Sequence, residues 1–457
     1  MLLVLALSAV VQAAGPAATF TNPVLNRKFA DPAVVRAANG TFFAFGTGDR
    51  IQVAASEDLV NWHYLGPAIG PGTNTKWGDG RTFWAADVTR HSWGGETTYV
   101  MYYAGVQSNT TPKNHCIGVA LSPTPQGPYT DVGTPLICRP SYIAIDPKRV
   151  DIGGKAHLFW GSGHGGAIFV SPLEPHSWRL LASPNLEPAL TFLFDGCCRG
   201  DGASSSVEIG PLSASACADA CVRNGTCTAI ELDGCLNSTQ CGKNCFHYFG
   251  TSGGTIIDGD CRLDGDMKCY QKAQAAEAPL PDRSPVQRAL LGDGAADASV
   301  VIQSNLQSEY EQTVEGAWVD FDADAPGGAA WFIYYSGSNC CTDKALYGVS
   351  VARAPANSPT GPFTKKAPPT SGFGSAILAS TFNGTEAGPW QAPGHNAIVR
   401  DDDGQAWMLY HAFRGADRAA GRVLMLQKVE YRDGWPWVGK PAAGQQQAPK
   451  ITTASLV

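Results

Sequence analysis

One pattern of short strands and turns recurs along this chain, and the repeat limits the folds open to it. Each copy has two strand-like runs followed by a turn that ends in Gly-Pro and an aromatic residue. The two clearest copies lie at 98–129 and 331–363, and similar runs at 407–411 and 423–427 lie near the end. Self-similarity of this kind indicates an architecture built from repeated supersecondary units.

A recurring unit of three or four short strands is typical of a β-propeller. Setting aside a leader at 1–14 and about 80 residues of a Cys-rich segment leaves roughly 363 of the 457 residues, or about 73 for each of five blades. The acidic motifs discussed below are spaced as one per blade. We therefore predict an all-β fold, a five-bladed β-propeller with a small disulfide-rich inserted module.

The Cys-rich segment is predicted to be that module. Ten of the 14 cysteines lie between Cys197 and Cys269, with a single histidine and no paired C-x₂-C knuckles. This composition favours disulfides over a zinc site. We expect these ten cysteines to pair mostly among themselves, and residues 213–221 to form a short helix. Cys116 and Cys138, which flank two strands of one blade, are candidates for a further bridge.

The first 14 residues, MLLVLALSAVVQAA, are predicted to be a signal peptide, since a short apolar run ends at a small-residue cleavage site. The net charge is −7 and no run of Lys or Arg exists, which argues against nucleic-acid and anionic-membrane partners. Five N-x-S/T sequons fit a secreted glycoprotein, and they start at Asn39, Asn109, Asn224, Asn237 and Asn383. The predicted organisation is a signal peptide at 1–14, propeller parts at 15–194 and 276–457, and the module at 195–275.

Two Asp-Pro motifs, at Asp31 and Asp146, place a carboxylate at the rigid entry to a strand. Proline disfavours helical backbone for the residue before it, so each Asp is held in another conformation. An Asp-Pro pair is also a common turn initiator, and that simpler explanation applies to each motif alone. Motifs at Glu315 and His395 follow in the same style later in the chain, and Asp87 lies between the two Asp-Pro motifs. In a propeller, such residues on the innermost strands converge on one funnel, and a ring of buried acids indicates a function.

In their order, these motifs resemble glycoside hydrolase family 43. The Ile-Asp-Pro motif, together with the vicinal Cys340-Cys341 after a Tyr-Tyr strand, is most similar to the endo-arabinanase branch. The resemblance covers nearly the whole chain except about 195–275, which looks like an Apple/PAN module. The motifs that carry the family resemblance are Phe83-Trp84-Ala85-Ala86-Asp87, Ala144-Ile145-Asp146-Pro147, Val314-Glu315-Gly316, Gly394-His395-Asn396 and Asp433-Gly434-Trp435-Pro436.

The resemblance implies a five-bladed propeller that hydrolyses α-L-arabinofuranosyl or β-D-xylosyl linkages with inversion. It implies that Asp31 is the general base, Glu315 the general acid, and Asp146 the residue that tunes and orients the acid. An inverting mechanism needs two carboxyl groups about 6.5–9.5 Å apart, with room for a water. The acid must keep its proton near neutral pH, and a neighbouring carboxylate raises its pKa in that direction.

The resemblance also implies an axial histidine, His395, that helps to hold calcium or ordered water in the central channel. No other cofactor is expected, and a core histidine bonded to backbone is the alternative. Trp84 and Phe29 are candidate walls for a sugar, or else core aromatics. Asp87 and Arg414 are further candidate substrate-binding residues.

Other charged residues lie close to these candidates in the sequence. Arg418 and Arg422 are near Arg414, so the choice of a sugar-binding arginine among the three stays open. Glu311, four residues before Glu315, lacks the following glycine and is expected to be a solvated charge.

The predicted function is a secreted glycosidase that cleaves arabinan-type polysaccharide and binds polysaccharide or oligosaccharide substrates. An exo-acting arabinofuranosidase or β-xylosidase is the chief rival. A catalytically silent carbohydrate-binding propeller is a further alternative, and the presence of all three acids favours the enzyme. The inserted module is a candidate carbohydrate- or protein-binding domain.

Overall fold

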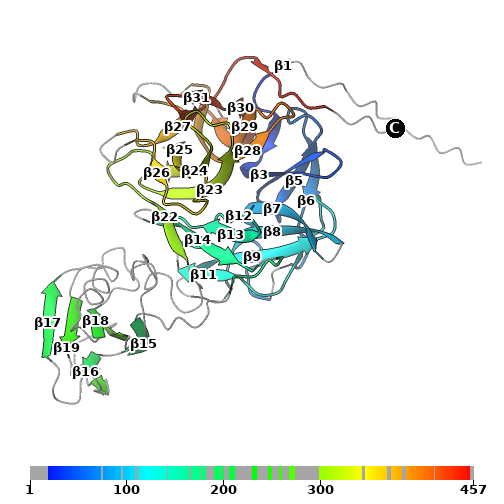
Figure 1. Ribbon diagram of the computed structural model, residues 1–457. Helices are drawn as coiled ribbons and strands as arrows, with labels where there is room; N and C mark the ends of the chain where they lie inside the picture. Colours follow the sequence, from blue (N-terminus) through cyan, green and yellow to red (C-terminus); the bar gives the residue numbers. More distant parts are fainter. Residues whose placement is uncertain are drawn as a thin grey trace, which may run out of the picture.

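The structure is a computed structural model, shown as a ribbon in Figure 1. It describes residues 19–181 and 298–452, apart from gaps at 74–75, 94–95, 109, 111–112, 141–142, 164–165, 175, 342–344, 368–371, 383–387 and 416. Between 182 and 297 it describes only the bounds and pairing of strands. No helix in these described parts has the length and apolar character needed to cross a membrane.

Five antiparallel sheets form the blades of a propeller, which confirms the predicted fold class (Figure 1). Blade I contains β3 (Ala30–Arg36), β4 (Phe42–Thr47), β5 (Gln52–Ser56) and β6 (His63–Pro67). Blade II contains β7 (Trp84–Trp93), β8 (Glu96–Val106), β9 (Asn114–Ser122), β10 (Thr130–Asp131) and β11 (Ile137–Pro140). Blade III contains β12 (Lys148–Ile152), β13 (Lys155–Trp160), β14 (Ala167–Leu173) and β22 (Ser299–Gln303).

The remaining two blades come from the later part of the chain, and one of them also takes up an early strand. Blade IV contains β23 (Val314–Asp322), β24 (Ala330–Asn339), β25 (Leu346–Pro355), β26 (Thr364–Lys365) and β27 (Ala376–Ala379). Blade V contains β28 (Trp390–Arg400), β29 (Ala406–Arg414), β30 (Asp417–Lys428) and, from the start of the chain, β2 (Leu25–Lys28). Outside the blades, β1 (Thr19–Phe20) pairs with β33 (Gln446–Gln447), and β31 (Glu430–Arg432) pairs with β32 (Trp435–Trp437). Because β2 completes blade V, the ring is closed by pairing the two ends of the fold.

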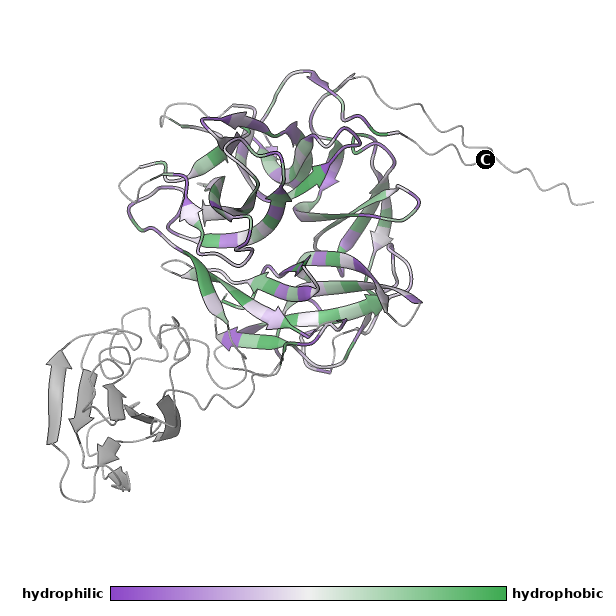
Figure 2. Cartoon of the chain, in the orientation of Figure 1, coloured by the Kyte–Doolittle hydropathy of each residue, from purple (hydrophilic) through white to green (hydrophobic). Residues whose placement is uncertain are grey.

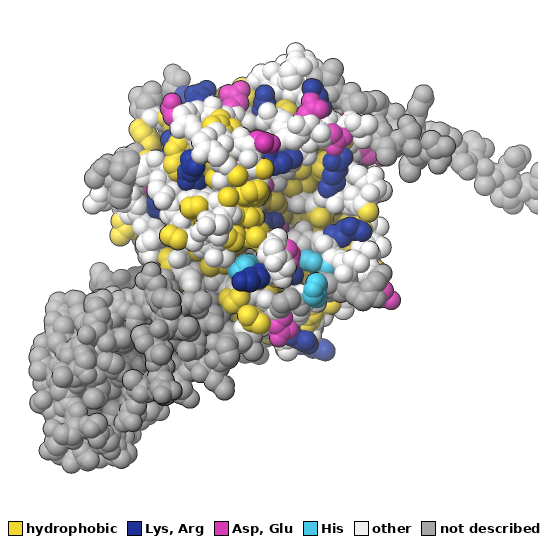
Figure 3. All heavy atoms as spheres, in the orientation of Figure 1, with side chains coloured by type: hydrophobic (Ala, Val, Ile, Leu, Met, Phe, Trp, Pro, Cys, Tyr) yellow, Lys and Arg dark blue, Asp and Glu magenta, His cyan; other side chains and the backbone are white. Residues whose placement is uncertain are grey.

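The hydrophobic core lies between neighbouring blades. Successive residues of a strand point to opposite faces, so each blade contributes to two apolar clusters. In β4, Phe42 and Ala44 face the cluster shared with blades IV and V, whereas Phe43 and Phe45 face blade II. Apolar residues accordingly run along the strands within the propeller (Figure 2). The face in Figure 3 mixes acidic and basic side chains, with no field of one sign among the residues described there.

The inserted segment interrupts blade III between its third and fourth strands. Its main sheet has the strand order β15-β21-β18-β19-β17, and a smaller one pairs β16 with β20. The strands are β15 (Leu190–Asp195), β16 (Cys197–Arg199), β17 (Ser205–Gly210), β18 (Ala229–Asp233), β19 (Cys245–Phe249), β20 (Ile257–Gly259) and β21 (Met267–Lys272). Because these strands pair with one another, blade III keeps its four strands despite the insertion.

Several predictions fall outside the described residues, including the leader at 1–14, the helix at 213–221 and the cysteine pairing within the module. The Cys116–Cys138 bridge is confirmed, and it joins register partners on β9 and β11. The Gly-Pro-aromatic turns of the repeat follow the third strands of blades II and IV, at Gly127 and Gly361. Both glycines have φ near +90°, which other residues rarely adopt.

The closure of the ring should depend on Asn22. Its side-chain amide donates to the Leu426 carbonyl and its oxygen accepts the Leu426 N–H, both at 2.9 Å. Asn22→Ala removes both hydrogen bonds, so we expect a loss of about 1–3 kcal/mol of stability. Thermal unfolding should show a lower midpoint, whereas the exposed loop variant Asn357→Ala should match the wild type. Equal midpoints for Asn22→Ala and the wild type would contradict this account.

Candidate active site

The innermost strand of each blade begins with the same backbone distortion. In β3, Ala30 pairs with Thr47 and Ala33 with Phe45, so two residues of β3 oppose one of β4. The same β-bulge opens the inner strands of the other blades. In every blade the first bulged residue has a left-handed backbone, and these residues are Asp31 (φ 53°), Ala85 (φ 44°), Asp146 (φ 54°), Gly316 (φ 60°) and His395 (φ 46°). Bulges of this kind re-aim side chains next to active sites.

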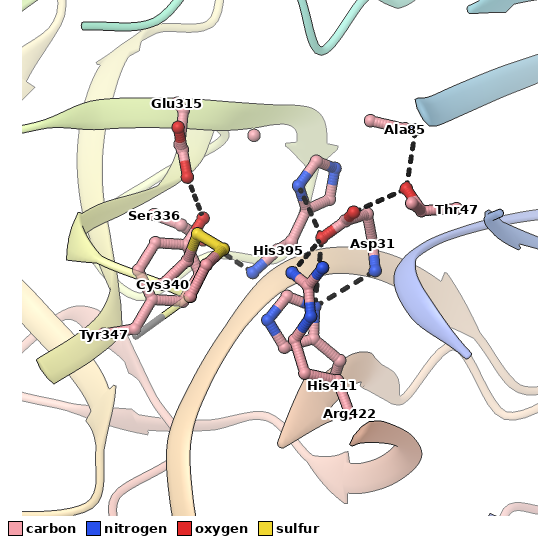
Figure 4. Close-up of polar contacts among 12 residues, drawn as sticks. Asp31, Thr47, Ala85, Glu315, Ser336, Cys340, Tyr347, His395, His411 and Arg422 are labelled. Carbon is pink, nitrogen blue, oxygen red and sulfur yellow. Dashed lines mark hydrogen bonds and ion pairs between the residues drawn. A yellow bond between two sulfur atoms is a disulfide. The ribbon is translucent and has the colours of Figure 1, made fainter. Parts of the chain in front are cut away.

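Because the bulges occupy equivalent positions in the five blades, they determine which of the predicted site residues lie close together. Asp31, Asp146 and His395 occupy the left-handed position itself, and the His395 ring nitrogen lies within 4 Å of both carboxyl groups. Figure 4 shows His395 beside Asp31. Glu315 lies one residue earlier, at the position that Trp84 occupies in blade II. Asp87 lies two residues after the left-handed Ala85, so its side chain points in a different direction from those of Asp31 and Asp146.

Asp31 is held by groups that favour its ionised form. Arg422 Nη1 lies 2.8 Å from its Oδ1, and the Thr47 hydroxyl donates to its Oδ2 at 2.5 Å (Figure 4). Burial raises the pKa of this carboxyl, but the opposing effects, of which the positive charge of Arg422 is the largest, outweigh it and bring the pKa well below its usual value. Asp31 is therefore a carboxylate at neutral pH.

Asp146 and Glu315 have the opposite tendency. The Gly316 N–H donates to Asp146 Oδ2 at 2.9 Å, and Glu315 contacts the Tyr347 hydroxyl at 2.6 Å and the Ser162 hydroxyl at 2.8 Å. Burial raises the pKa of both carboxyls, and it outweighs the hydrogen bonds from Tyr347 and Ser162 that lower the pKa of Glu315. The negative charges of Glu315 and Asp31 raise the pKa of Asp146 further, and that of Asp31 raises the pKa of Glu315. The amide can only donate and favours ionised Asp146, whereas a hydroxyl can turn to accept. Both carboxyl groups therefore hold a proton more readily than Asp31 does.

Two neutral histidines link these acids. His395 Nδ1 lies 3.6 Å from Asp31 Oδ1 and 3.9 Å from Asp146 Oδ2, and a Cβ on Gly316 would approach this nitrogen to 3.0 Å. Burial lowers the pKa of His395, and burial together with Arg422 lowers that of His411 to about 3. His411 Nδ1 accepts the Asp31 N–H at 3.0 Å, and its ring stacks on Tyr347. It therefore touches both the Asp31 backbone and the tyrosine that contacts Glu315.

Asp87 does not join this cluster. Lys148 Nζ lies 2.9 Å from its Oδ1, and the Arg149 N–H donates to its Oδ2 at 2.8 Å, all in buried surroundings. The Lys148 ammonium also lies 3.5 Å from the centre of the Trp318 ring. Asp87, Lys148 and Trp318 are equivalent positions of blades II, III and IV, so they connect three successive inner strands.

The other predicted substrate-binding residues, Phe29, Trp84 and Arg414, lie in three different surroundings. Phe29 is fully buried in the core, so it forms no exposed sugar wall in this structure. Trp84 is half-buried and stacks on His115. Arg414 contacts Asn26 and lies 5.9 Å from the Trp390 ring centre, and of the three neighbouring arginines it is Arg422 that reaches Asp31.

The expectation that Glu311 is a solvated charge is wrong. Its side chain is buried, accepts a hydrogen bond from Tyr335 and lies 3.0 Å from Lys365 Nζ. Gly374 makes room for it, because a Cβ there would come within 2.2 Å of Glu311 Oε2. The glutamate ties the loop before β23 to blade IV.

Comparison with family models shows which family the chain belongs to. The model of Glycosyl hydrolases family 43 matches residues 20–193 and 328–436, more than half of the chain. The chain belongs to this family. Its fold agrees: a thermostable family-43 glycoside hydrolase superposes with a TM-score of 0.54 at 17% identity, over 95% of this chain and 100% of that one.

The curated relatives of this family 43 chain align over shorter stretches. Arabinan endo-1,5-alpha-L-arabinosidase C of Emericella nidulans is 33% identical over 130 residues, 28% of this chain and 39% of that protein. The extracellular exo-alpha-(1->5)-L-arabinofuranosidase ArbA of Cellvibrio japonicus is 28% identical over 173 residues, 33% of this chain and 48% of that protein. The chain thus spans less than half the length of either relative.

The calcium or ordered water expected beside His395 stays a prediction. Calcium prefers oxygen ligands, and His395 offers nitrogen. No group of three or more His, Cys, Asp or Glu side chains among the described residues is arranged to hold a metal ion. No chemical step is assigned to a metal here.

Sequence reasoning missed several groups that hold the acids. Thr47, Ser162 and Tyr347 lie on or beside second and third strands, where nothing in the sequence separates them from other strand residues. The sequence presents Arg422 only as a neighbour of Arg414. Arg422 is identified by its register position on β30, opposite Phe413 of β29. A single sequence does not reveal the register between strands.

Removing the Arg422 charge should destabilise the protein in a pH-dependent way. In Arg422→Gln, Asp31 is buried without its cation, which costs roughly 3 kcal/mol at neutral pH. The pKa of Asp31 then rises, so Asp31 takes up a proton as the pH falls and the cost is relieved. Unfolding midpoints should therefore differ most from the wild type at pH 7 and less at pH 4.

Arg418→Gln is the matched control for this experiment. Arg418 donates to the neutral Gln391 side chain, so the effect of its loss should not change between the two pH values. A pH-independent deficit in Arg422→Gln would show that Arg422 does not govern the ionisation of Asp31.

Proposed function

We propose that this chain is a secreted, inverting glycoside hydrolase that cleaves α-L-arabinofuranosyl linkages in arabinan-type polysaccharide. The observation that carries the proposal is the opposite displacement of two pKa values, that of Asp31 downward and that of Glu315 upward. Two carboxyl groups pushed apart in this way are suited to act as base and acid at the same pH. Membership of family 43 supports glycosidic bonds as the target.

In the proposed mechanism, ionised Asp31 takes a proton from a water molecule as that water attacks the anomeric carbon. Glu315 donates its proton to the departing glycosidic oxygen. Thr47 and Arg422 fix the Asp31 carboxylate, while Tyr347 and Ser162 fix Glu315. One attack from the side opposite to the leaving group inverts the anomeric configuration.

Asp146 serves Glu315 rather than the substrate in this proposal. It accepts the N–H of Gly316, the residue that follows Glu315, and so anchors the bulge that aims the acid. Its negative charge also makes ionisation of Glu315 less favourable. Both effects keep a protonated acid in place.

The arabinan substrate and the secretion are supported by the relatives and the sequence. The aligned fungal relative is named as an endo-arabinosidase, and the exo-acting ArbA is named as extracellular. The similarity to ArbA also supports a second candidate function, an exo-acting arabinofuranosidase that uses the same three acids. The predicted leader at 1–14 and the Cys116–Cys138 disulfide fit an oxidising, extracellular environment. The module at 195–275 is proposed as an accessory binding domain.

The roles of acid and base predict different responses to the leaving group. Glu315→Gln should abolish hydrolysis of arabinan but retain much of the activity on an aryl arabinofuranoside, whose leaving group departs without a proton. Asp31→Asn should lose at least about 100-fold on both substrates, since water needs a base in either case. Steady-state rates on linear arabinan and the aryl glycoside test this.

Proton NMR of the first product formed should show the inverted anomer. If both variants responded alike to the leaving group, the roles would be wrong. If external azide rescued Glu315→Gln with retention of configuration, the inverting mechanism would be excluded. Full activity in both variants would favour a carbohydrate-binding propeller.

The pH profile should depend on Asp146. Activity requires protonated Glu315 and therefore falls as the pH rises through the pKa of this carboxyl. Asp146→Asn removes a neighbouring negative charge, so that pKa falls and the alkaline limb of kcat/KM should move to lower pH. The acid limb, set by Asp31, should move less. An alkaline limb that stays in place would show that Asp146 does not tune the acid.

A further inference from the structure

The segment that follows β24 begins with two cysteines bonded to each other. Cys340 and Cys341 form a vicinal disulfide, with Cys341 exposed and Cys340 half-buried. The mechanism proposed above makes no use of this bond.

The bond contributes little to the stability of the fold. A disulfide stabilises mainly by closing a loop in the unfolded chain, and the benefit grows with loop length. Cys116 and Cys138 are 22 residues apart and join two strands, whereas Cys340 and Cys341 are neighbours in the sequence. Its effect is therefore local, on the shape and chemistry of the surface.

Strand register places this surface at the active-site end of blade IV. Glu315, at the start of β23, pairs with Ser336 near the end of β24. Two residues further, Ser338 pairs with Tyr347, whose hydroxyl contacts Glu315. The disulfide follows two residues beyond Ser338, and Figure 4 draws Cys340 in the same close-up as Tyr347 and Glu315.

Hydrogen bonds fix the backbone around the disulfide. The Ser338 N–H donates to the Thr313 carbonyl at 3.2 Å, which ties the end of β24 to the residues just before Glu315. The Cys341 N–H donates to Asn339 Oδ1 at 3.2 Å. A surface held in this way binds a ligand with little loss of conformational freedom.

We propose that the Cys340–Cys341 disulfide is an apolar platform for the sugar on the leaving-group side of the scissile bond. Sulfur is soft and polarisable, and it suits contact with the C–H face of a furanose ring. The side follows from the chemistry, because Glu315 protonates the leaving oxygen and the disulfide lies in the same blade as Glu315. This inference rests on the proposed function of the site.

The test is a comparison of ligand lengths. In a Glu315→Gln background, which prevents turnover, Cys340→Ser/Cys341→Ser should weaken binding of arabinotriose about tenfold. Binding of methyl α-L-arabinofuranoside, which has no second sugar, should be unchanged. The matched control, Cys116→Ala/Cys138→Ala in the same background, should bind both ligands as the parent does. Calorimetric titration gives the dissociation constants.

Equal weakening for both ligands, or no weakening for arabinotriose, would overturn the platform. Should the double variant fold poorly, the wild-type exposed bond can be reduced with a phosphine, checked by mass spectrometry, and the same loss is expected. Xylotriose is titrated in parallel with the Glu315→Gln parent. If xylotriose binds and arabinotriose does not, the proposed arabinan specificity is wrong. The platform is then tested by comparing xylotriose binding with and without Cys340→Ser/Cys341→Ser. If neither binds, both proposals are wrong.

Discussion

The pairing of Arg422 with Asp31 is the interaction on which the site depends. Asp31, Asp146 and Glu315 are brought into one buried cluster, where three negative charges would repel one another strongly. A single cation on one side of the cluster makes Asp31 the carboxyl that ionises most easily. Burial and neighbouring negative charges raise the pKa values of Asp146 and Glu315. Arg422 thus separates the ionisation of Asp31 from that of the other two carboxyl groups.

The backbone makes this separation possible. A β-bulge with a left-handed first residue opens every inner strand, and the blades differ mainly in the residue placed there. Aspartate tolerates this conformation better than most residues, and Gly316 adopts it freely beside His395. The site is therefore one backbone feature repeated five times, with different side chains.

The surrounding blades hold these bulges in register. Apolar clusters fill the space between neighbouring blades, and the buried Asp87–Lys148 pair with Trp318 connects three inner strands next to the site. The inserted segment leaves between β14 and β22 and pairs within itself, so it adds a module without changing the inner strands. Function and insertion thus occupy different parts of the blade.

The sequence by itself determined the five blades, the position of the insertion and the presence of Asp31, Asp146, Glu315 and His395 on the inner strands. Periodic strands and Asp-Pro motifs are local signals, and they survive in a single sequence. Only the tertiary structure decided that Asp87 pairs with Lys148, that Phe29 and Glu311 are buried, and that Arg422 rather than Arg414 reaches Asp31. These outcomes depend on register between strands as much as 391 residues apart, and on a bulge that shifts side-chain direction by one residue.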